Sequence, residues 1–241
     1  MKKNFSLNKI IENMTVVILA GGFGSRIGEY TKNIPKPMIM ISGKPIISHL
    51  IDYYKSYGLK NFIIAGGYKY KILENYFKNK KNIKVINTGI KTLTGTRVKK
   101  LSKYLSDTFF LTYGDGLSNV NIKNSLLSHL KFKKMITMTA VRPIARFGEI
   151  NVRNNKLISF EEKPQLSRGW INGGFFVINK DFIKLIPNKN VMLEREPILN
   201  AIRLRQINLF MHNKFWFCVD TLRDLFKLRQ IAQSKKCPWK K

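Results

Sequence analysis

The fold of this chain is decided by Thr15-Val-Val-Ile-Leu-Ala-Gly-Gly-Phe-Gly-Ser-Arg26 and by Pro35-Lys36-Pro37 shortly after it. The apolar run Thr15–Ala20 is typical of a parallel strand that is buried on both faces. The following segment, Gly21–Pro37, is rich in Gly, Pro and polar residues and predicts a long functional loop. A buried strand that runs straight into a Gly-rich loop is typical of α/β folds, which bind ligands where their strands end.

Strands and helices alternate downstream of this stretch. Pro at the start and Gly58 after the end mark the helix expected at Pro45–Tyr57. The alternation predicts a parallel, doubly wound sheet. Further strands are expected at Asn61–Ala65, Ile83–Asn87 and Thr108–Thr112, and further helices at Lys69–Phe77 and Gly95–Leu105.

The second half of the chain has a different pattern, in which short strands follow one another with brief connections. These strands predict a small mixed-sheet extension of the main sheet. They are expected at Lys134–Val141, Glu149–Val152, Leu157–Glu161 and Gly174–Ile178. Two helices, near Glu194–Arg205 and Thr221–Gln233, are expected to flank a β pair formed by Asn208–His212 and Phe215–Val219. The fold class is thus α/β, a Rossmann-like doubly wound mixed sheet with a small β extension.

The composition of the chain limits which functions it can have. The chain has 241 residues, is 44% hydrophobic, and carries a formal charge of +30, so one sizeable core is possible. Such a charge raises the possibility of nucleic-acid binding. However, Lys is spread along the whole chain, no compact Arg-rich block occurs, and A/T-rich codons explain the abundance of Lys, Ile and Asn. We therefore expect no nucleic-acid partner, and a field that attracts phosphorylated small molecules.

Neither a membrane span nor a metal cage built on cysteine is expected. No apolar stretch reaches the roughly 18 residues that a span requires, and no apolar segment typical of a signal peptide directly follows Met1–Asn13. Cys218 and Cys237 are too few and too isolated for a disulfide framework. These features predict a cytoplasmic protein without a membrane partner.

The Gly-rich loop has the chemistry of a phosphate site. Glycines allow the backbone to approach a nucleotide and to turn its amides toward phosphate oxygens, while Arg26 and Lys36 can neutralise a triphosphate. The loop matches neither the dinucleotide fingerprint nor the P-loop. An ordinary Gly-rich turn with solvated cations is the alternative, but the preceding buried strand and the close spacing of both cations favour a functional loop.

The segment Leu19–Arg26 with Pro35-Lys36-Pro37 resembles the signature of the sugar-1-phosphate nucleotidyltransferases, and the resemblance covers nearly the whole chain after Met14. Within that family it resembles most the glucose-1-phosphate cytidylyltransferases. The segments that carry this similarity are Leu93–Arg97, Thr112–Gly116, Arg146–Glu149, Phe160–Pro164, Ile171–Val177, Glu194–Pro197, Val219–Asp224 and Pro238–Lys240.

The resemblance implies a fold of the nucleotide-diphospho-sugar transferase type and a reaction. CTP and α-D-glucose 1-phosphate would give CDP-glucose and pyrophosphate with Mg²⁺ as cofactor, for deoxysugar or surface-polysaccharide synthesis. Residues 14–241 would form a single domain with a nucleotide-binding half, 14–120, and a sugar-phosphate-binding half, 121–241, in which the β extension completes the sugar pocket. Residues 1–13 would be an N-terminal extension, and the protein a homo-oligomer.

Roles for individual residues follow from the same resemblance. The nucleotide would be bound by Leu19, Ala20, Gly21, Gly22, Phe23, Gly24, Ser25, Arg26, Lys36, Thr92, Arg97 and Gly114. The metal ligands would be Asp115 and Asp220, and the sugar phosphate would be bound by Glu162, Lys163, Asn172 and Gly173. The catalytic residues would be Arg26, Lys36, Asp115 and Lys163.

Each of these positions also has a structural explanation. Asp115 precedes a glycine, as turn aspartates do, and Asp220 could cap the helix that follows it. Thr92 and Arg97 could be a helix-capping residue and a solvated charge. Glu162 and Lys163 could form a surface ion pair, and Asn172-Gly173-Gly174 could be a β-bulge.

The expected chemistry needs no general base, because the nucleophile is a phosphate oxygen that is already anionic. The enzyme has to bring two anions together and stabilise the developing charge. His49, His129 and His212 are therefore expected to be structural or solvent-facing. Within the same chemistry, another sugar phosphate or NTP (UTP, dTTP or GTP) is the alternative. A non-catalytic nucleotide-sugar-binding regulatory protein is the alternative from another class.

Overall fold

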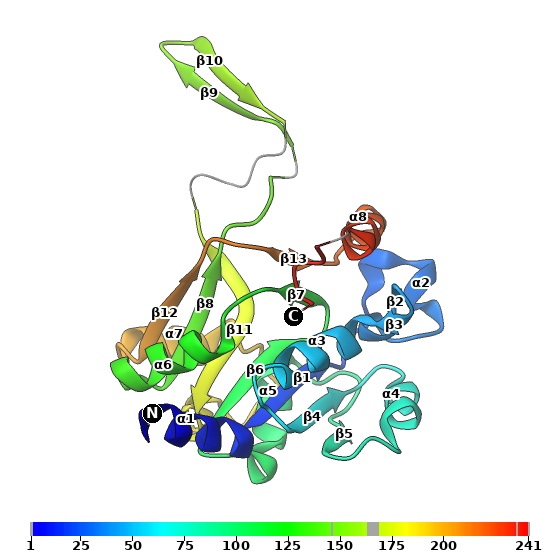
Figure 1. Ribbon diagram of the computed structural model, residues 1–241, viewed down its shortest axis with the longest axis vertical. Helices are drawn as coiled ribbons and strands as arrows, with labels where there is room; N and C mark the ends of the chain where they lie inside the picture. Colours follow the sequence, from blue (N-terminus) through cyan, green and yellow to red (C-terminus); the bar gives the residue numbers. More distant parts are fainter. Residues whose placement is uncertain (1, 146, 163–168, 235, 241) are drawn as a thin grey trace.

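The computed structural model describes residues 2–145, 147–162, 169–234 and 236–240. Its centre is a seven-stranded sheet with strand order β12-β8-β11-β6-β1-β4-β5 (Figure 1). In chain order these strands are β1 (Thr15–Ala20), β4 (Asn61–Gly66), β5 (Ile83–Asn87), β6 (Thr108–Tyr113), β8 (Ile136–Val141), β11 (Ile171–Asn179) and β12 (Ile207–His212).

The sheet is mixed, as the sequence predicts. Its pairings are parallel except for those of β11, which runs antiparallel to both β6 and β8. The chain proceeds from β1 outward through β4 to β5 and then crosses back, so that β6 lies on the other side of β1. This reversal creates a topological switch point beside β1, which is where ligands bind in such sheets.

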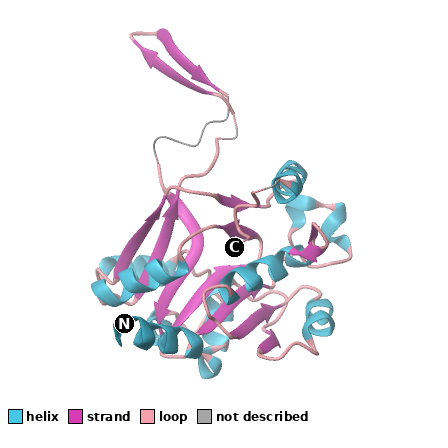
Figure 2. Ribbon diagram, in the orientation of Figure 1, coloured by secondary structure: helices cyan, strands magenta, loops and turns pink. Residues whose placement is uncertain are grey.

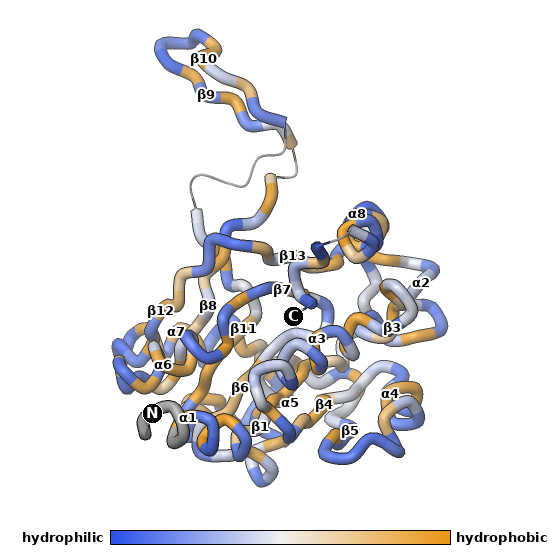
Figure 3. The backbone as a smooth tube through the Cα atoms, in the orientation of Figure 1, coloured by the Kyte–Doolittle hydropathy of each residue, from blue (hydrophilic) through white to orange (hydrophobic). Residues whose placement is uncertain are grey.

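Helices cover both faces of the sheet (Figure 2). Val16 and Ile18 of β1 belong to one apolar core and Val17 and Leu19 to the other, because alternate strand residues point to opposite faces. Hydrophobic residues accordingly recur along the central strands (Figure 3). The first core is completed by α1 (Lys2–Asn13), α3 (Ile46–Lys55), α4 (Tyr70–Phe77), α6 (Ile122–Phe132) and α8 (Leu222–Gln233), and the second by α5 (Thr94–Lys100) and α7 (Glu196–Arg203).

The predicted β pair near residues 208–219 is wrong. The strand β12 lies parallel to β8 at the edge of the main sheet, whereas β13 (Trp216–Cys218) pairs with β7 (Gly116–Ser118). The short connection between them suggests a hairpin, but each strand pairs instead with a strand that is distant in the sequence. Two of the strands assigned to the β extension, β8 and β11, also belong to the main sheet.

The extension that remains is one hairpin. Its strands are β9 (Glu149–Arg153) and β10 (Lys156–Glu161), and among the described strands they pair only with each other. The hairpin projects away from the rest of the molecule (Figure 1). Glu149, at the start of β9, is nevertheless among the residues that line a cavity beside the sheet.

The other differences concern helices. The N-terminal residues form α1, which buries Leu7 and Ile11 in the first core. The sequence reasoning placed no helix at α6, and the helix expected at Gly95–Leu105 is the shorter α5 followed by the single turn Ser102–Tyr104. None of the helices in the described ranges is both long and apolar enough to cross a membrane.

His129 joins α6 to the sheet. Its ring is 4% exposed, and its Nδ1 lies 2.9 Å from the Thr137 hydroxyl on β8. Burial lowers the pKa of His129 to about 4, from 6.5 for an ordinary histidine. Between these two values the unfolded chain binds a proton that the folded chain does not, so protonation favours unfolding.

We therefore expect the free energy of unfolding to fall as the pH drops from 6.5 to 4, with His129 contributing up to about 1.4 kcal/mol per pH unit. His129→Leu removes this contribution, so its curve of stability against pH should be flatter in that range. Urea unfolding of both proteins at several pH values measures the difference. The two curves should be parallel above pH 6.5, and equal slopes below it would contradict the assignment.

Candidate active site

The candidate site lies at the carboxyl ends of β1 and β6, beside the switch point. The Gly-rich loop leaves β1 at Gly21, and the turn that contains Asp115 leaves β6. The amide of Gly114 donates a hydrogen bond of 2.9 Å to the Leu19 carbonyl, which holds the two strand ends together. A cavity of about 520 Å³ opens here, within the usual size range of ligand pockets. Its lining includes Leu19, Ala20, Gly21, Gly22, Phe23, Gly24, Ser25, Arg26, Lys36, Thr92, Arg97 and Asp115.

Lys36 is the centre of the polar groups in this cavity. Its Nζ lies 2.6 Å from Asp115 Oδ2 and 2.9 Å from Asp220 Oδ1, and its side chain is 11% exposed. Burial alone would lower the pKa of Lys36, but the Asp115 and Asp220 carboxylates outweigh this effect and raise it above the usual value. The ammonium group is therefore charged. Arg26 reaches the same cluster, with Nη1 3.3 Å from Asp220 Oδ2, while most of its side chain remains exposed.

Asp220 is not the residue that caps α8. Thr221 is the N-cap, and it forms a capping box with Asp224: the Thr221 hydroxyl accepts from the Asp224 amide, and the Asp224 carboxylate accepts from the Thr221 amide. The amide of Asp220 also donates to Asp224. Since Asp224 satisfies the helix terminus, the Asp220 carboxylate can face Lys36.

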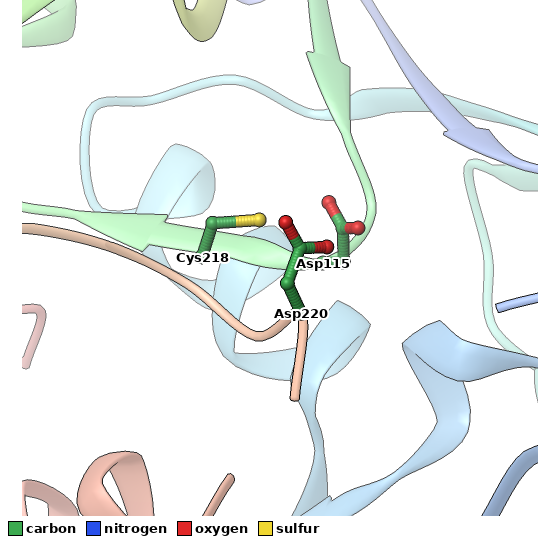
Figure 4. A group of neighbouring side chains, drawn as sticks. All are labelled: Asp115, Cys218 and Asp220. Atoms are coloured by element: carbon green, nitrogen blue, oxygen red, sulfur yellow. The ribbon is translucent and has the colours of Figure 1, made fainter. Parts of the chain in front are cut away.

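The carboxylates have the chemistry of a site for a divalent cation. Ligand atoms of Asp115, Cys218 and Asp220 lie within 4.8 Å of one another, and Figure 4 shows the three side chains converging. Carboxylate oxygens suit a hard cation such as Mg²⁺, which takes its other ligands from phosphates and water. Burial raises the pKa of the Cys218 thiol, so this soft, protonated group is a poor ligand for Mg²⁺. The two aspartates therefore fit a metal, provided that Lys36 gives way between them.

Arg97 holds the backbone that forms the wall of the cavity. One of its Nη atoms donates to the Gly66 carbonyl and the Thr88 hydroxyl, and the other to the carbonyls of Gly21 and Ile90. The side chain is buried, and desolvation lowers the pKa of its guanidinium. Arg97 thus ties the end of β4 to the segments that follow β1 and β5, and it is not a solvated charge.

Thr92 lines the same cavity but uses its hydroxyl locally. The hydroxyl donates a hydrogen bond of 2.6 Å to the Thr88 carbonyl and accepts one of 3.3 Å from Lys100. These contacts fix the loop between β5 and α5.

The lining residues that the sequence did not indicate as site residues are Pro37, Ile90, Lys91, Leu93, Thr94, Tyr113, Met192 and Cys218. Tyr113 and Cys218 both line the cavity. The Tyr113 hydroxyl donates to Glu194, whose other oxygen accepts from the Thr94 hydroxyl at 2.7 Å. Burial, reinforced by the Glu194 charge, raises the pKa of Tyr113, which therefore stays protonated. The available signal was that Tyr113 and Glu194 lie in two of the segments that carry the family resemblance, Thr112–Gly116 and Glu194–Pro197.

Of the residues predicted for the sugar phosphate, the described ones, Glu162, Asn172 and Gly173, are not among those that line the cavity around the acidic cluster. Asn172 lies in an irregularity of β11, and its side-chain oxygen accepts from the Gly174 amide at 2.9 Å. The Gly173 carbonyl accepts a 2.7 Å hydrogen bond from the Trp216 indole. Glu162 lies at the end of the hairpin and lines neither cavity of this region, and Lys163 lies outside the described residues.

A second cavity, of about 770 Å³, opens between the root of the hairpin and α8. Cys218 and Asp220 line both cavities, so the two spaces meet beside the acidic cluster. The remaining lining residues are Pro143, Ile144, Ala145, Phe147, Gly148, Glu149, Ile171, Trp216, Phe217, Thr221, Arg223, Asp224 and Lys227.

An open α/β sheet that carries a Gly-rich loop, two cations and paired carboxylates at its switch point is typical of enzymes that act on nucleotides. A family model described as nucleotidyl transferase matches residues 15–235. The glucose-1-phosphate cytidylyltransferase of Salmonella typhimurium is 37% identical over 254 aligned residues, covering 94% of this chain and 99% of that one. The chain belongs to the nucleotidyl transferase family.

The chain is also similar to a further relative and, in its fold, to a solved structure. The D-glycero-alpha-D-manno-heptose 1-phosphate guanylyltransferase of Campylobacter jejuni is 33% identical over 70% of this chain and 77% of its own. The crystal structure of HddC from Yersinia pseudotuberculosis complexed with GMP-PN has a TM-score of 0.70 at 24% identity, covering 90% of this chain and 98% of that chain. The structural likeness confirms the predicted Rossmann-like α/β fold.

Alanine substitutions at Gly21 and Gly22 test whether Arg97 holds the wall of the cavity. A Cβ atom on Gly21 would lie 2.2 Å from Arg97 Cζ, whereas one on Gly22 would meet nothing within 4 Å. We expect Gly21→Ala to displace the guanidinium and to lower the free energy of unfolding by about 2 kcal/mol or more, through lost buried hydrogen bonds. The matched control, Gly22→Ala, should stay within about 0.5 kcal/mol of the parent protein. Denaturant unfolding without nucleotide measures both, and similar losses would contradict the role of Arg97.

Lys36 and a divalent cation should compete for the same oxygens. In the absence of nucleotide, Lys36→Met is expected to bind Mn²⁺ at least roughly tenfold more tightly, because a unit positive charge is removed from between the two carboxylates. Isothermal titration calorimetry measures the affinity for Mn²⁺, and the measurement does not depend on turnover. Lys44→Met, which breaks only the exposed pair of Lys44 with Asp52, is the control. An unchanged Mn²⁺ affinity in Lys36→Met would refute the competition.

Proposed function

We propose that this protein transfers the cytidylyl group of CTP to α-D-glucose 1-phosphate, forming CDP-glucose and pyrophosphate. The observation that carries the proposal is the cluster of Lys36, Asp115 and Asp220 where two cavities meet. Such a cluster suits a reaction in which two phosphate-bearing substrates approach from different sides. The 37% identity to the Salmonella typhimurium cytidylyltransferase, which covers nearly the full length of both chains, favours CTP and glucose 1-phosphate.

The chemistry is an in-line displacement. A phosphate oxygen of the sugar 1-phosphate attacks the α-phosphorus of CTP, a new P–O bond forms, and the bond to the bridging oxygen of the leaving pyrophosphate breaks. Arg26 and Lys36 neutralise the triphosphate and hold it in position, which offsets the repulsion between the two anions. The nucleophile is already ionised at neutral pH, so no residue has to remove a proton from it.

Asp115 and Asp220 would hold the Mg²⁺ ion, with Lys36 turning from them toward the phosphates. When bound, such an ion supplies positive charge that stabilises the α-phosphate and the departing pyrophosphate. The chain's own contribution is the position of both carboxylates: one follows β6, and the other follows β13 immediately before the capped helix α8.

The two cavities are assigned to the two substrates. We place the nucleotide in the cavity beside the Gly-rich loop, where residues 19–26 and Gly114 approach it and Arg97 fixes the surrounding backbone. We place the sugar phosphate in the larger cavity beside α8, with Asn172 and Gly173 on the neighbouring strand. Glu162 and Lys163 would join this subsite from the end of the hairpin. On this assignment, residues 14–120 and 121–241 are two halves of one domain.

The proposal also covers the use of the product, the partners of the protein and its oligomeric state. CDP-glucose would be used for deoxysugar or surface-polysaccharide synthesis in the cytoplasm, without a nucleic-acid or membrane partner. The enzyme would be a homo-oligomer.

The reaction is tested by incubating the protein with Mg²⁺, each of the four NTPs and several sugar 1-phosphates, and following pyrophosphate release. We expect release that requires both CTP and glucose 1-phosphate. We also expect Asp115→Asn to lose at least roughly 10²-fold in kcat, because it removes a charge that helps to hold the cation. Asp52→Asn is the control, because it alters an exposed carboxylate that is not among the lining residues of either cavity.

Each other outcome has a definite meaning. Release with a different NTP or sugar phosphate would keep the chemistry and correct the substrates. Full activity of Asp115→Asn would refute the metal assignment. A folded protein that binds nucleotide sugars but releases no pyrophosphate with any pair would instead be a binding protein.

A further inference from the structure

A half-buried carboxylate beside the nucleotide cavity, that of Glu194, plays no part in the displacement as proposed. Glu194 precedes α7 and is not among the described residues that line either cavity. Its two oxygens accept hydrogen bonds from two neutral hydroxyl groups, those of Tyr113 and Thr94, the second at 2.7 Å. Both of these residues line the nucleotide cavity. Glu194 is therefore joined to the lining of that cavity at two points.

The direction of each hydrogen bond to Glu194 is fixed by the other contacts of the donors. The Thr94 hydroxyl accepts from the Leu193 amide at 2.8 Å, so its own hydrogen is free to be donated to Glu194. The Tyr113 hydroxyl has a single hydrogen, which it also donates to Glu194. Because this hydrogen is already used, Tyr113 has no proton to give to a ligand in the cavity. The pair can therefore act on a ligand only through its position.

Tyr113 also contacts β11, the strand that carries Asn172. Its ring lies against the backbone of Gly174, where it leaves no room for a Cβ atom, and it packs edge-on against Phe176 with the ring centroids 6.0 Å apart. The Asn172 side chain interacts with the Tyr113 hydroxyl. Because the Asn172 oxygen accepts from the Gly174 amide at 2.9 Å, its NH₂ group is the donor to Tyr113. Tyr113 is thus held from two sides, by β11 and by Glu194.

The segment that contains Glu194 is bound tightly to a wall of the nucleotide cavity. Residues 190–194 are joined to residues 91–96 by hydrogen bonds from the Leu93 amide to the Asn190 side chain (2.9 Å), from the Gly95 amide to the Val191 carbonyl (3.1 Å) and from the Val191 amide to the Thr96 hydroxyl (2.9 Å). Leu93, Thr94 and Met192 of these two segments line the cavity. The two segments therefore form one unit of the wall, and a displacement of Glu194 would displace that unit.

The strand β6 connects this wall to the acidic cluster. It lies between β1 and β11 in the main sheet, and Tyr113 is its last residue (Figure 1). Asp115 follows two residues later in the turn that faces Lys36. The contact of Tyr113 with Glu194 is consequently a junction between three parts of the site: the wall of the nucleotide cavity, the turn with Asp115, and β11.

We propose that Glu194 is a positioning residue for the transfer step. Through the Tyr113 hydroxyl it holds the wall of the nucleotide cavity in a fixed position relative to Asp115 and to Asn172. The inference rests on the proposed function, because a reaction between two bound substrates requires the nucleotide side and the sugar side of the site to be aligned. A misplacement of about 1 Å can lower a rate roughly 10²-fold, so the loss of one hydrogen bond at this junction should affect kcat.

The kinetics of pyrophosphate release test the proposal. Tyr113→Phe removes the hydroxyl but keeps the ring, so we expect kcat to fall at least roughly tenfold, while the KM values for CTP and glucose 1-phosphate change less than about threefold. Glu194→Gln places an NH₂ group opposite one of the two donors and should have a similar effect. Glu196→Gln is the matched control, because it removes a nearby carboxylate that pairs with Lys189 at the surface, and its kcat should stay within about twofold of the parent value.

The double variant distinguishes one shared contact from two separate defects. If Tyr113 and Glu194 act through the same hydrogen bond, Tyr113→Phe combined with Glu194→Gln should lose about as much kcat as the more affected single variant. Losses that multiply in the double variant would overturn the pairing. Parent-like kcat in both single variants, or a rise of KM for CTP without a loss of kcat, would overturn the positioning role.

Binding without turnover provides a second measurement. CDP-glucose would occupy both sides of the junction, whereas CMP would occupy only the nucleotide side. In isothermal titration calorimetry, Tyr113→Phe and Glu194→Gln should each weaken CDP-glucose binding at least roughly fivefold and leave the affinity for CMP within about twofold of the parent value. Equal losses for the two ligands would show a general disturbance of the cavity and would overturn the proposal.

These measurements separate the inference from the proposed reaction. A parent protein that binds CDP-glucose but releases no pyrophosphate would refute the reaction, and calorimetry would still decide whether the junction aligns the two sides. A parent protein that binds CDP-glucose no better than CMP would overturn the inference, since the two sides would then not be occupied together. An active parent protein with parent-like variants would overturn the inference alone.

Discussion

The candidate site depends on one interaction, the ammonium group of Lys36 between the carboxylates of Asp115 and Asp220. A largely buried cation is costly unless it is paired and hydrogen-bonded. The three residues come from the loop after β1, the turn after β6 and the segment before α8. Because the charge of Lys36 needs both partners, it holds these segments in one arrangement. The groups that a phosphate and a cation would contact are thus in place before either arrives.

Arg97 likewise holds the opposite wall of the nucleotide cavity in one arrangement, through a different set of contacts. Its guanidinium has a planar fork of donors, and here the donors are directed at backbone carbonyls and a hydroxyl instead of at carboxylates. The position of the loop after β1 is therefore fixed by the protein itself. A ligand that meets such a loop loses less free energy to ordering it. Arg97→Lys would not be conservative, because an ammonium group cannot span the same acceptors.

Much of the fold was predictable because its signals are local. A buried apolar run such as Thr15–Ala20 and the glycine after it mark strand and loop without any knowledge of distant partners. The pairing of β12 with β8 was not predictable in this way, because both edges of a strand satisfy the same backbone pattern and the choice depends on packing elsewhere. For the same reason the sequence indicated Lys36 and Asp115 as functional, but not the contact of Tyr113 with Glu194, which are far apart in the chain. Site roles carried over by resemblance remain predictions.

The second half of the chain does more than supply a neighbouring pocket. The strand β13 pairs with β7, directly after Asp115, and the Val219 amide donates to the Asp115 carbonyl at 3.1 Å. The Trp216 indole also donates to the Gly173 carbonyl of β11. These bonds fix the backbone that carries Asp220 to the turn after β6, to β7 and to the antiparallel strand β11 of the main sheet. The acidic cluster is consequently a property of the complete mixed sheet, and a nucleotide-binding half isolated from β13 would retain Lys36 and Asp115 but lose the carboxylate that completes the pair.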